Sequence, residues 1–410
     1  MRLPGDRLDG FSLPTVLVIC VLMALILLSA LAFASLDRQN YAVYHRQKQW
    51  ILDLHSVAAK YRVDSTLVRP GDSLTVTLSG TPDSDVSVSL SRWGFYEVAS
   101  FRSEHLPFTH TQIVGKAFPS KFESVLYVAD RNRPLSLAGT TRVEGVIHAP
   151  QGGINYTELM GRPFTGPEIP TEDWRVSTDR LPPLDSTVFA YLDSLAGLRP
   201  QAWYHLNVPD ARNSFLARTN LSYSRNPDET FNMRGNRILY ADKLWIGKNS
   251  TLDGILAFAK TATIEDGFEG CLQLFCTDSI VVGRDVRLRY PSGLYAANEE
   301  EHPCITMRQG SWVDGYVMAL TGGREDMMLE HPCLRQEEGA VVEGLLYVDG
   351  TACVRGSVNG AAYLRDCFYD ESGEKYPGVL YDCTFSQAED MVYPVVIDGP
   401  YRRRAIKKVY

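Results

Sequence analysis

HPCITMRQGSWVDG at residues 302–315 and HPCLRQEEGAVVEG at residues 331–344 are two copies of one pattern. Each copy begins with His-Pro-Cys, carries a glycine six residues after its cysteine, and ends on a second glycine. Looser copies of the glycine-bounded part occur at Gly139–Gly145, Asn249–Gly254, Gly283–Leu288 and Gly356–Gly360. Short strands that meet at glycine corners and recur about every 15 to 30 residues are typical of a β-solenoid. We therefore predict a mainly β chain with a β-helix (solenoid) over residues 236–395.

The early copy of the pattern places the first solenoid coil at residues 134–151. Residues 152–235 then interrupt the solenoid with a proline-rich insertion, and the solenoid resumes near Ile238. Within the insertion, residues 186–196 have a cap residue at the start, apolar residues on one face and a glycine after the end, which predicts one short helix. A jelly roll or β-sandwich would also give short strands and is the alternative fold.

Near the N-terminus, the residues from Gly10 to Leu36 include none that is charged at neutral pH. An apolar helix of this length crosses a bilayer. Beyond it the helical spacing continues to about Lys60, with a set of apolar residues on one face: Trp50, Leu54, Val57, Ala58 and Tyr61. We predict a leader at residues 1–10 and a transmembrane and stem helix at residues 11–60.

The start of this helix, Gly10-Phe11-Ser12-Leu13, resembles the signal of type IV prepilins and pseudopilins. The resemblance implies cleavage between Gly10 and Phe11, methylation of the new amino group, and assembly with other pilin-like subunits. The fifth residue after the cut, a glutamate in the family, is Thr15 here. Loss of that charge disfavours stacking beneath another copy of the chain, so the resemblance implies a minor subunit, PilX-like or like a large tip pseudopilin.

Two other fates of the N-terminus stay open. Ala32-Phe33-Ala34 has the form of a signal-peptidase site, and removal of the apolar stretch there would release the chain. Without any cleavage, the helix would be a simple signal anchor. The anchored alternatives predict a single-pass inner-membrane protein of a Gram-negative bacterium, with the C-terminal domain in the periplasm or on the cell surface.

A small β module is expected at residues 61–133. Apolar and polar residues alternate over residues 73–79 and 86–91, and a glycine and a proline lie between the two runs. This pattern predicts an antiparallel pair packed on the stem helix. We expect residues 124–129 to complete that sheet.

Four side chains of the paired copies are candidate metal ligands: His302, Cys304, His331 and Cys333. If the copies stack in register, these residues could bind zinc. Neighbouring strands lie about 4.8 Å apart, which also suits a Cys304–Cys333 disulfide, or the cysteines could be plain core residues. Among these alternatives, an oxidising compartment favours the disulfide or the core over zinc.

The C-terminal residues 396–410 hold the one basic cluster of the chain: Arg402, Arg403, Arg404, Lys407 and Lys408. Such a tail could bind a polyanion or an acidic partner, or it could be solvated or paired with acidic side chains. The net charge of −8 favours the second alternative and gives no reason to expect nucleic-acid binding.

The 410 residues, 45% of them hydrophobic, exclude a disordered or collagen-like chain. No phosphate-binding loop, HExxH helix or GxSxG elbow is present, and no cofactor is expected. We therefore predict a membrane-anchored structural or interaction protein that displays its solenoid to a polysaccharide or protein ligand. The alternative is a β-helical polysaccharide hydrolase or lyase that uses corner carboxylates such as Asp253, Asp314 and Glu343.

Overall fold

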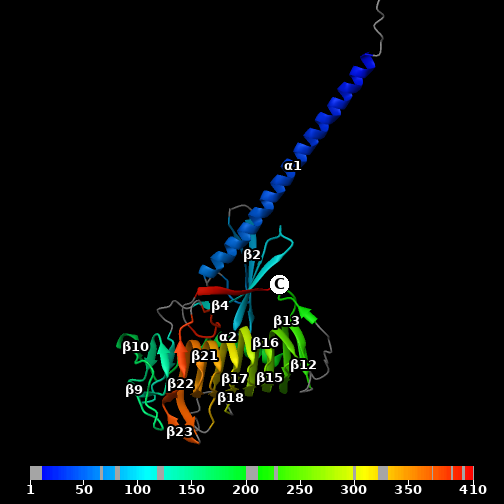
Figure 1. Cartoon of the computed structure of the whole chain (residues 1–410). Coiled ribbons are helices and arrows are strands. Elements are labelled where there is room, and N and C mark those ends of the chain that lie inside the picture. Colours follow the sequence, from blue (N-terminus) through cyan, green and yellow to red (C-terminus); the bar gives the residue numbers. More distant parts are fainter. Residues whose placement is uncertain are drawn as a thin grey trace, which may run out of the picture.

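The computed structural model describes residues 12–64, 68–78, 84–117, 124–199, 211–225, 230–298, 302–321, 331–371, 373–388, 391–398 and 402–409. The chain is mainly β, with one long N-terminal helix that projects from the body (Figure 1). The predicted combination of a β-rich chain and a long apolar helix is therefore confirmed.

Helix α1 (Ser12–Val63) is unbroken over 52 residues. Over the described residues it is the one helix that is long and apolar enough to cross a membrane. Its side chains are exposed as far as residue 49. Its last turns pack on the five-stranded sheet described next, through Leu54, Val57, Ala58 and Tyr61. These four belong to the face that the helical spacing predicted.

A five-stranded antiparallel sheet receives the end of α1, and we call it the small sheet. Its strands, in spatial order, are β1 (Ser73–Thr77), β2 (Asp85–Trp93), β3 (Tyr96–Arg102), β4 (Thr109–Ala117) and β26 (Arg402–Val409). The predicted antiparallel pair is present, with Ser73 opposite Ser89.

The expectation that residues 124–129 complete the small sheet is wrong. Strand β5 (Leu126–Val128) instead pairs in parallel with β22 (Ser357–Glu371), and the C-terminal strand β26 occupies the edge of the small sheet. All three residues of β5 are buried. A strand that is apolar on both sides suits a sheet covered on both faces, which the body provides.

The body is one closed sheet whose strands are parallel apart from the β22–β23 pair. Its remaining strands are β7 (Arg142–Glu144), β8 (Ile147–Ala149), β10 (Trp174–Val176), β11 (Ala211–Asn213), β12 (Asn220–Ser224), β13 (Asn232–Ala241), β14 (Lys243–Ile246), β15 (Thr251–Ile264), β16 (Glu269–Val282), β17 (Arg287–Ala297), β18 (Cys304–Met307), β19 (Trp312–Leu320), β20 (Leu334–Gln336), β21 (Val341–Val354), β23 (Glu374–Pro377) and β25 (Thr384–Ser386). A separate sheet holds β24 (Val379–Tyr381), β6 (Leu135–Ala138) and β9 (Ile154–Tyr156). A 3₁₀ turn, η2 (Thr171–Asp173), and helix α2 (Ser186–Gly197) complete the described elements, and α2 is the predicted short helix.

The two quoted copies pair in the register that the sequence indicates. Gly315 lies opposite Gly344, and Gly344 lies opposite Gly360. All three have a φ between +134° and +147°, which side chains rarely adopt. A Cβ at Gly344 would lie 2.0 Å from the carbonyl oxygen of Gly315. The corner therefore requires glycine both for its backbone angles and for the close approach of the next repeat.

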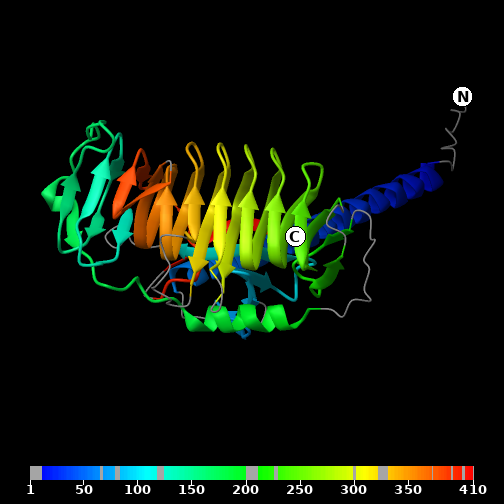
Figure 2. The same ribbon diagram turned by 90° about the horizontal axis from the view of Figure 1, so that it is seen from below.

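The predicted position of the early copy is wrong. Strand β7 pairs with β25, so residues 142–144 stack beyond the last repeat rather than ahead of Ile238. Figure 2 shows this teal segment at one end of the body and the green first repeats at the other. Between these two ends of the body, α2 lies lengthwise against it (Figure 2).

In one layer of strands of the body, the side chains on both faces of the sheet are apolar. Its inward column joins one residue from each repeat: Leu239, Ala257, Leu274, Leu294, Val317, Leu346, Ala362 and Leu126. Its outward column, which we call the aromatic column, consists of Tyr240, Phe258, Phe275, Tyr295, Met318, Tyr347, Tyr363 and Tyr127. Exposure of such a column to water would be costly, and α2 and the small sheet cover it.

The turn between β2 and β3 docks the small sheet on this outer face. Gln273, which is fully buried, donates from Nε2 to the carbonyl of Trp93 at 3.0 Å and accepts the N–H of Phe95 at 2.9 Å. Its Oε1 also accepts the hydroxyl of Tyr316 at 2.9 Å. Gly94 has a φ of +58°, and a Cβ there would lie 2.2 Å from this oxygen. The side-chain amide of Gln273 thus satisfies both the Trp93 carbonyl and the Phe95 N–H of the turn, where apolar side chains surround them.

Substitution Gly344→Ala tests the glycine corner. We expect a loss of about 3 kcal/mol in the free energy of unfolding, because the methyl group meets a backbone oxygen at a positive φ. Gly197→Ala is the matched control, since a Cβ there meets nothing within 4 Å. Chemical denaturation followed by circular dichroism measures both variants. Equal stability of the two variants would contradict the proposed corner.

Candidate functional site

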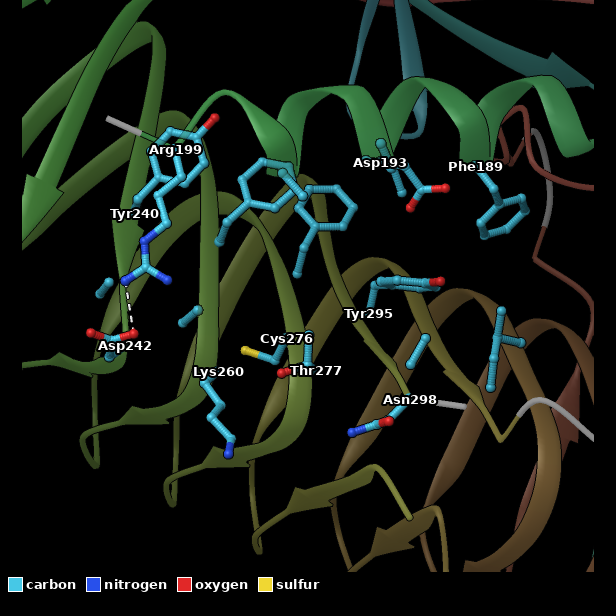
Figure 3. A pocket seen from close by; sticks show the side chains of 18 of the residues that line it. Phe189, Asp193, Arg199, Tyr240, Asp242, Lys260, Cys276, Thr277, Tyr295 and Asn298 are labelled. Atoms are coloured by element: carbon cyan, nitrogen blue, oxygen red, sulfur yellow. Dashed lines mark hydrogen bonds and ion pairs between the residues drawn. The ribbon is translucent and has the colours of Figure 1, made fainter. Parts of the chain in front are cut away.

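A groove of about 710 Å³ lies between α2 and the outer face of the body (Figure 3). Its floor is the first half of the aromatic column, and one wall is α2, with Phe189, Leu192 and Asp193. The opposite rim is formed where the strands turn away from the column. We call this cavity the aromatic groove.

The rings of the floor come from successive repeats. Tyr240 stacks on Phe258 at 5.5 Å between ring centroids, and Phe258 stacks on Phe275 at 4.9 Å, both with an interplanar angle of 19°. Tyr295 breaks this order, because its ring is tilted by 57° from that of Phe275. Phe258 and Tyr295 are half-buried, whereas Tyr240 and Phe275 are buried. The groove therefore gives access to two rings of the column.

Hydrogen bonds fix both ends of α2. At its start, the Asp185 carboxylate accepts the N–H of Thr187 as an N-cap, and Arg92 of β2 donates to the Thr187 hydroxyl at 2.7 Å. Toward its end, the Tyr240 hydroxyl donates to the carbonyl of Leu195 at 2.7 Å. The helix is thus a fixed wall of the groove.

Charged residues close one end of the groove. Arg199 pairs with Asp242 at 2.7 Å and donates to the hydroxyl of Tyr223 at 2.8 Å, and Tyr223 donates to Asp242 at 2.9 Å. The hydrogen bonds from Arg199 and then from Tyr223 lower the pKa of Asp242. A carboxyl group with a lowered pKa is a poor general acid, so Asp242 is suited to binding rather than to proton donation.

The rest of the rim is polar. Lys260 lies 3.4 Å from Asp278, and Asp349 lies 3.1 Å from Arg365. Asp193 projects from α2 toward the groove in Figure 3. Its carboxylate is exposed and makes no hydrogen bond or ion pair with a described residue. The aromatic groove thus combines an apolar floor with one carboxylate, that of Asp193, that has no partner among the described residues.

The candidate zinc ligands do not assemble into a metal site. The rings of His302 and His331 stack at 5.9 Å, as the register predicts. Cys304 and Cys333 are both free thiols: Cys304 lies 3.8 Å from the Thr306 hydroxyl, whereas the buried Cys333 sulfur lies against Gly350. Among the described residues, no group of three or more His, Cys, Asp or Glu side chains is placed to bind a metal.

The basic C-terminal residues are not a free tail, because Arg402, Arg403, Arg404, Lys407 and Lys408 all lie in β26. The Arg403 Nε atom pairs with Glu97 Oε2 at 2.7 Å, and the two side chains are 4% and 3% exposed. The guanidinium also lies over the ring of Tyr61 in α1. This outcome agrees with the alternative of pairing with acidic side chains. The candidate processing residues Gly10 and Phe11 lie outside the described residues.

Two of the corner carboxylates are neighbours. Asp314 and Glu343 lie opposite each other on adjacent repeats, whereas Asp253 lies opposite Cys271 on other repeats. Burial, and then the charge of Glu343, raise the pKa of Asp314 to about 7. Neither Asp314 nor Glu343 lines the aromatic groove.

Sequence reasoning missed the aromatic groove, although a signal for it is present. An inward leucine followed by an outward aromatic residue recurs in five of the eight repeats, at Leu126-Tyr127, Leu239-Tyr240, Leu274-Phe275, Leu294-Tyr295 and Leu346-Tyr347. The glycine pattern drew attention to the corners, and this second pattern marks the face that needs a cover. Comparison of the chain with protein-family models, curated proteins and solved structures finds no match.

The buried ion pair gives a prediction for stability. Glu97→Gln is expected to cost about 3 kcal/mol of unfolding free energy, because it leaves the Arg403 charge buried without its partner. Replacement of both residues by Met is expected to cost less. The exposed pair of Arg142 and Glu144 is the control, and Glu144→Gln is expected to cost less than about 0.5 kcal/mol. Denaturant titration measures all three variants, and an equal cost at both pairs would refute the role of the buried pair.

The raised pKa of Asp314 predicts a dependence of stability on pH. Its carboxyl group is protonated in the folded state and ionised in the unfolded state between about pH 4 and its folded pKa of about 7, so stability falls as the pH rises through this window. Asp314→Asn is expected to flatten the fall, and Glu343→Gln to reduce it. Melting temperatures from pH 4 to 8 test this, and an unchanged slope in Asp314→Asn would contradict it.

Proposed function

We propose that the chain is a membrane-anchored protein that displays a β-solenoid on a rigid helical stem, and that its role is binding rather than catalysis. The observation that carries this proposal is helix α1. The same helix contains the apolar span, an exposed middle section and the turns that pack on the small sheet. Helix α1 thus leads directly from the proposed membrane span to the small sheet, which is docked on the body.

The exposed section sets the distance of the body from the membrane. The uncharged stretch ends at Leu36, and the first buried side chain of α1 is that of Asp53. The intervening helix spans about 24 Å at 1.5 Å per residue. That length exceeds the headgroup layer, so the body would stand clear of the bilayer.

The closed parallel sheet supports the solenoid half of the proposal. Successive repeats pair in parallel from β13 to β22, and their inward side chains form one continuous core. This is the stacking principle of repeat proteins, in which each repeat contacts chiefly its neighbours. The early segment at β5, β7 and β8 would then act as a cap on one end.

A minor pilin-like or pseudopilin-like subunit is the form of this function that we favour. Helix α1 is a long apolar helix near the N-terminus, and its last turns pack on an antiparallel sheet. Tyr41, Val43 and Tyr44 are exposed on the free section, where helices of neighbouring subunits could pack. By this proposal the anchor lies in the inner membrane of a Gram-negative bacterium, with the body in the periplasm or on the cell surface.

Mass spectrometry of the mature N-terminus tests the proposal. A start at methylated Phe11 is the expected result. A start at Ser35 would mean that the stem is cut away and would overturn the anchored form, whereas an intact Met1 would retain the anchor and exclude pilin-like processing. Gly10→Leu is the matched variant, and it is expected to leave the leader attached.

A polysaccharide-cleaving enzyme is a second candidate, favoured by one observation. Asp314 and Glu343 form a carboxyl pair in which Asp314 has the raised pKa of a general acid. Release of reducing ends from neutral glycans, lost in both Asp314→Asn and Glu343→Gln, would support it. Absence of this activity from the purified protein would leave binding as the function.

A further inference from the structure

We infer that the aromatic groove binds an uncharged glycan chain, laid along the body with its sugar faces on the rings and its hydroxyl groups toward the rim. This inference rests on the proposed display function and gives it a ligand.

The shape suits an extended ligand. The floor crosses four repeats, from Tyr240 to Tyr295, and neighbouring strands are about 4.8 Å apart. Helix α2 forms a wall parallel to this direction (Figure 2). A linear chain of several sugar rings can therefore contact repeated positions, one after another.

The floor of the groove matches the apolar C–H face of a sugar ring, and the rim matches its hydroxyl groups. The half-buried rings of Phe258 and Tyr295 offer apolar surface to the C–H face of a pyranose. Beside them, Asp193, Thr277 and Asn298 provide carboxylate, hydroxyl and amide groups for its hydroxyls. A few polar groups around an apolar floor are the usual composition of a small-molecule site, in which the polar groups set orientation.

The same features disfavour other ligands. A polyanion would meet Asp193, Asp242 and Asp349, while both cations of the lining, Arg199 and Lys260, already have carboxylate partners. A peptide that binds by adding a strand needs a free sheet edge, but the floor is a sheet face whose strands are paired on both sides. A bare acyl chain would contact the floor but use none of the polar groups of the rim.

The test is calorimetric titration of the full-length protein in lipid nanodiscs free of glycoside detergents. The probes are three neutral hexasaccharides: cellohexaose, maltohexaose and hexa-N-acetylchitohexaose. We expect at least one to bind with a Kd between about 1 µM and 1 mM. Asp193→Ala is expected to weaken binding about fivefold and Tyr295→Leu about tenfold.

Ser194→Ala is the matched control. Its hydroxyl bonds to the carbonyl of Tyr191 on α2, it is exposed, and it does not line the groove. We expect its affinity to equal that of the parent chain, and melting temperatures to show that each variant is folded.

Three results would overturn the inference. The first is that no hexasaccharide binds up to about 10 mM, and the second is that neither Asp193→Ala nor Tyr295→Leu changes the affinity. The third is that oleate or an unstructured decapeptide displaces a bound hexasaccharide at a lower concentration. None of these bears on the mature N-terminus, so failure of the glycan site and failure of the anchored display function are distinguishable.

Discussion

The aromatic column on the outside of the closed sheet is the constraint on which the rest of the structure depends. A parallel sheet is normally buried on both faces, and here the inner face is filled by the column of aliphatic residues. The outer column, from Tyr240 to Tyr127, must be removed from water by something else. Helix α2 and the small sheet meet this need, and the incomplete cover at one end leaves the aromatic groove.

Two buried polar contacts convert this cover into a fixed arrangement. Gln273 satisfies the turn between β2 and β3, which seats the small sheet on the body. The pair of Glu97 and Arg403 lies at the junction of the small sheet with the Tyr61 ring of α1. Apolar burial supplies the driving force, and these contacts select one docking geometry, because misplacement would leave buried polar groups unpaired. The end of α1, the small sheet and the body are thus joined as one unit up to the aromatic groove.

Local sequence patterns predicted the local structure well. The glycine register placed Gly315 opposite Gly344, the capped segment became α2, and the stem residues from Leu54 to Tyr61 pack on a sheet. The failures were long-range. Nothing in residues 139–145 shows at which end of the stack of repeats they lie. Likewise, nothing in the residues around Arg403 shows that this arginine pairs with Glu97, which lies some 300 positions earlier in the chain. The groove was missed because it arises between elements, whereas periodicity describes each element alone.

The central claim is that the small sheet and the body form one docked unit, and hydrogen exchange at the Phe95 amide tests it most directly. In the parent chain this N–H donates to Gln273, so we predict exchange as slow as that of the interior amides of β15 and β16. In Gln273→Leu the same amide should exchange much faster, while β15 and β16 keep their protection. Fast exchange at Phe95 in the parent chain would mean that the small sheet is not seated on the aromatic column, and the account would fail.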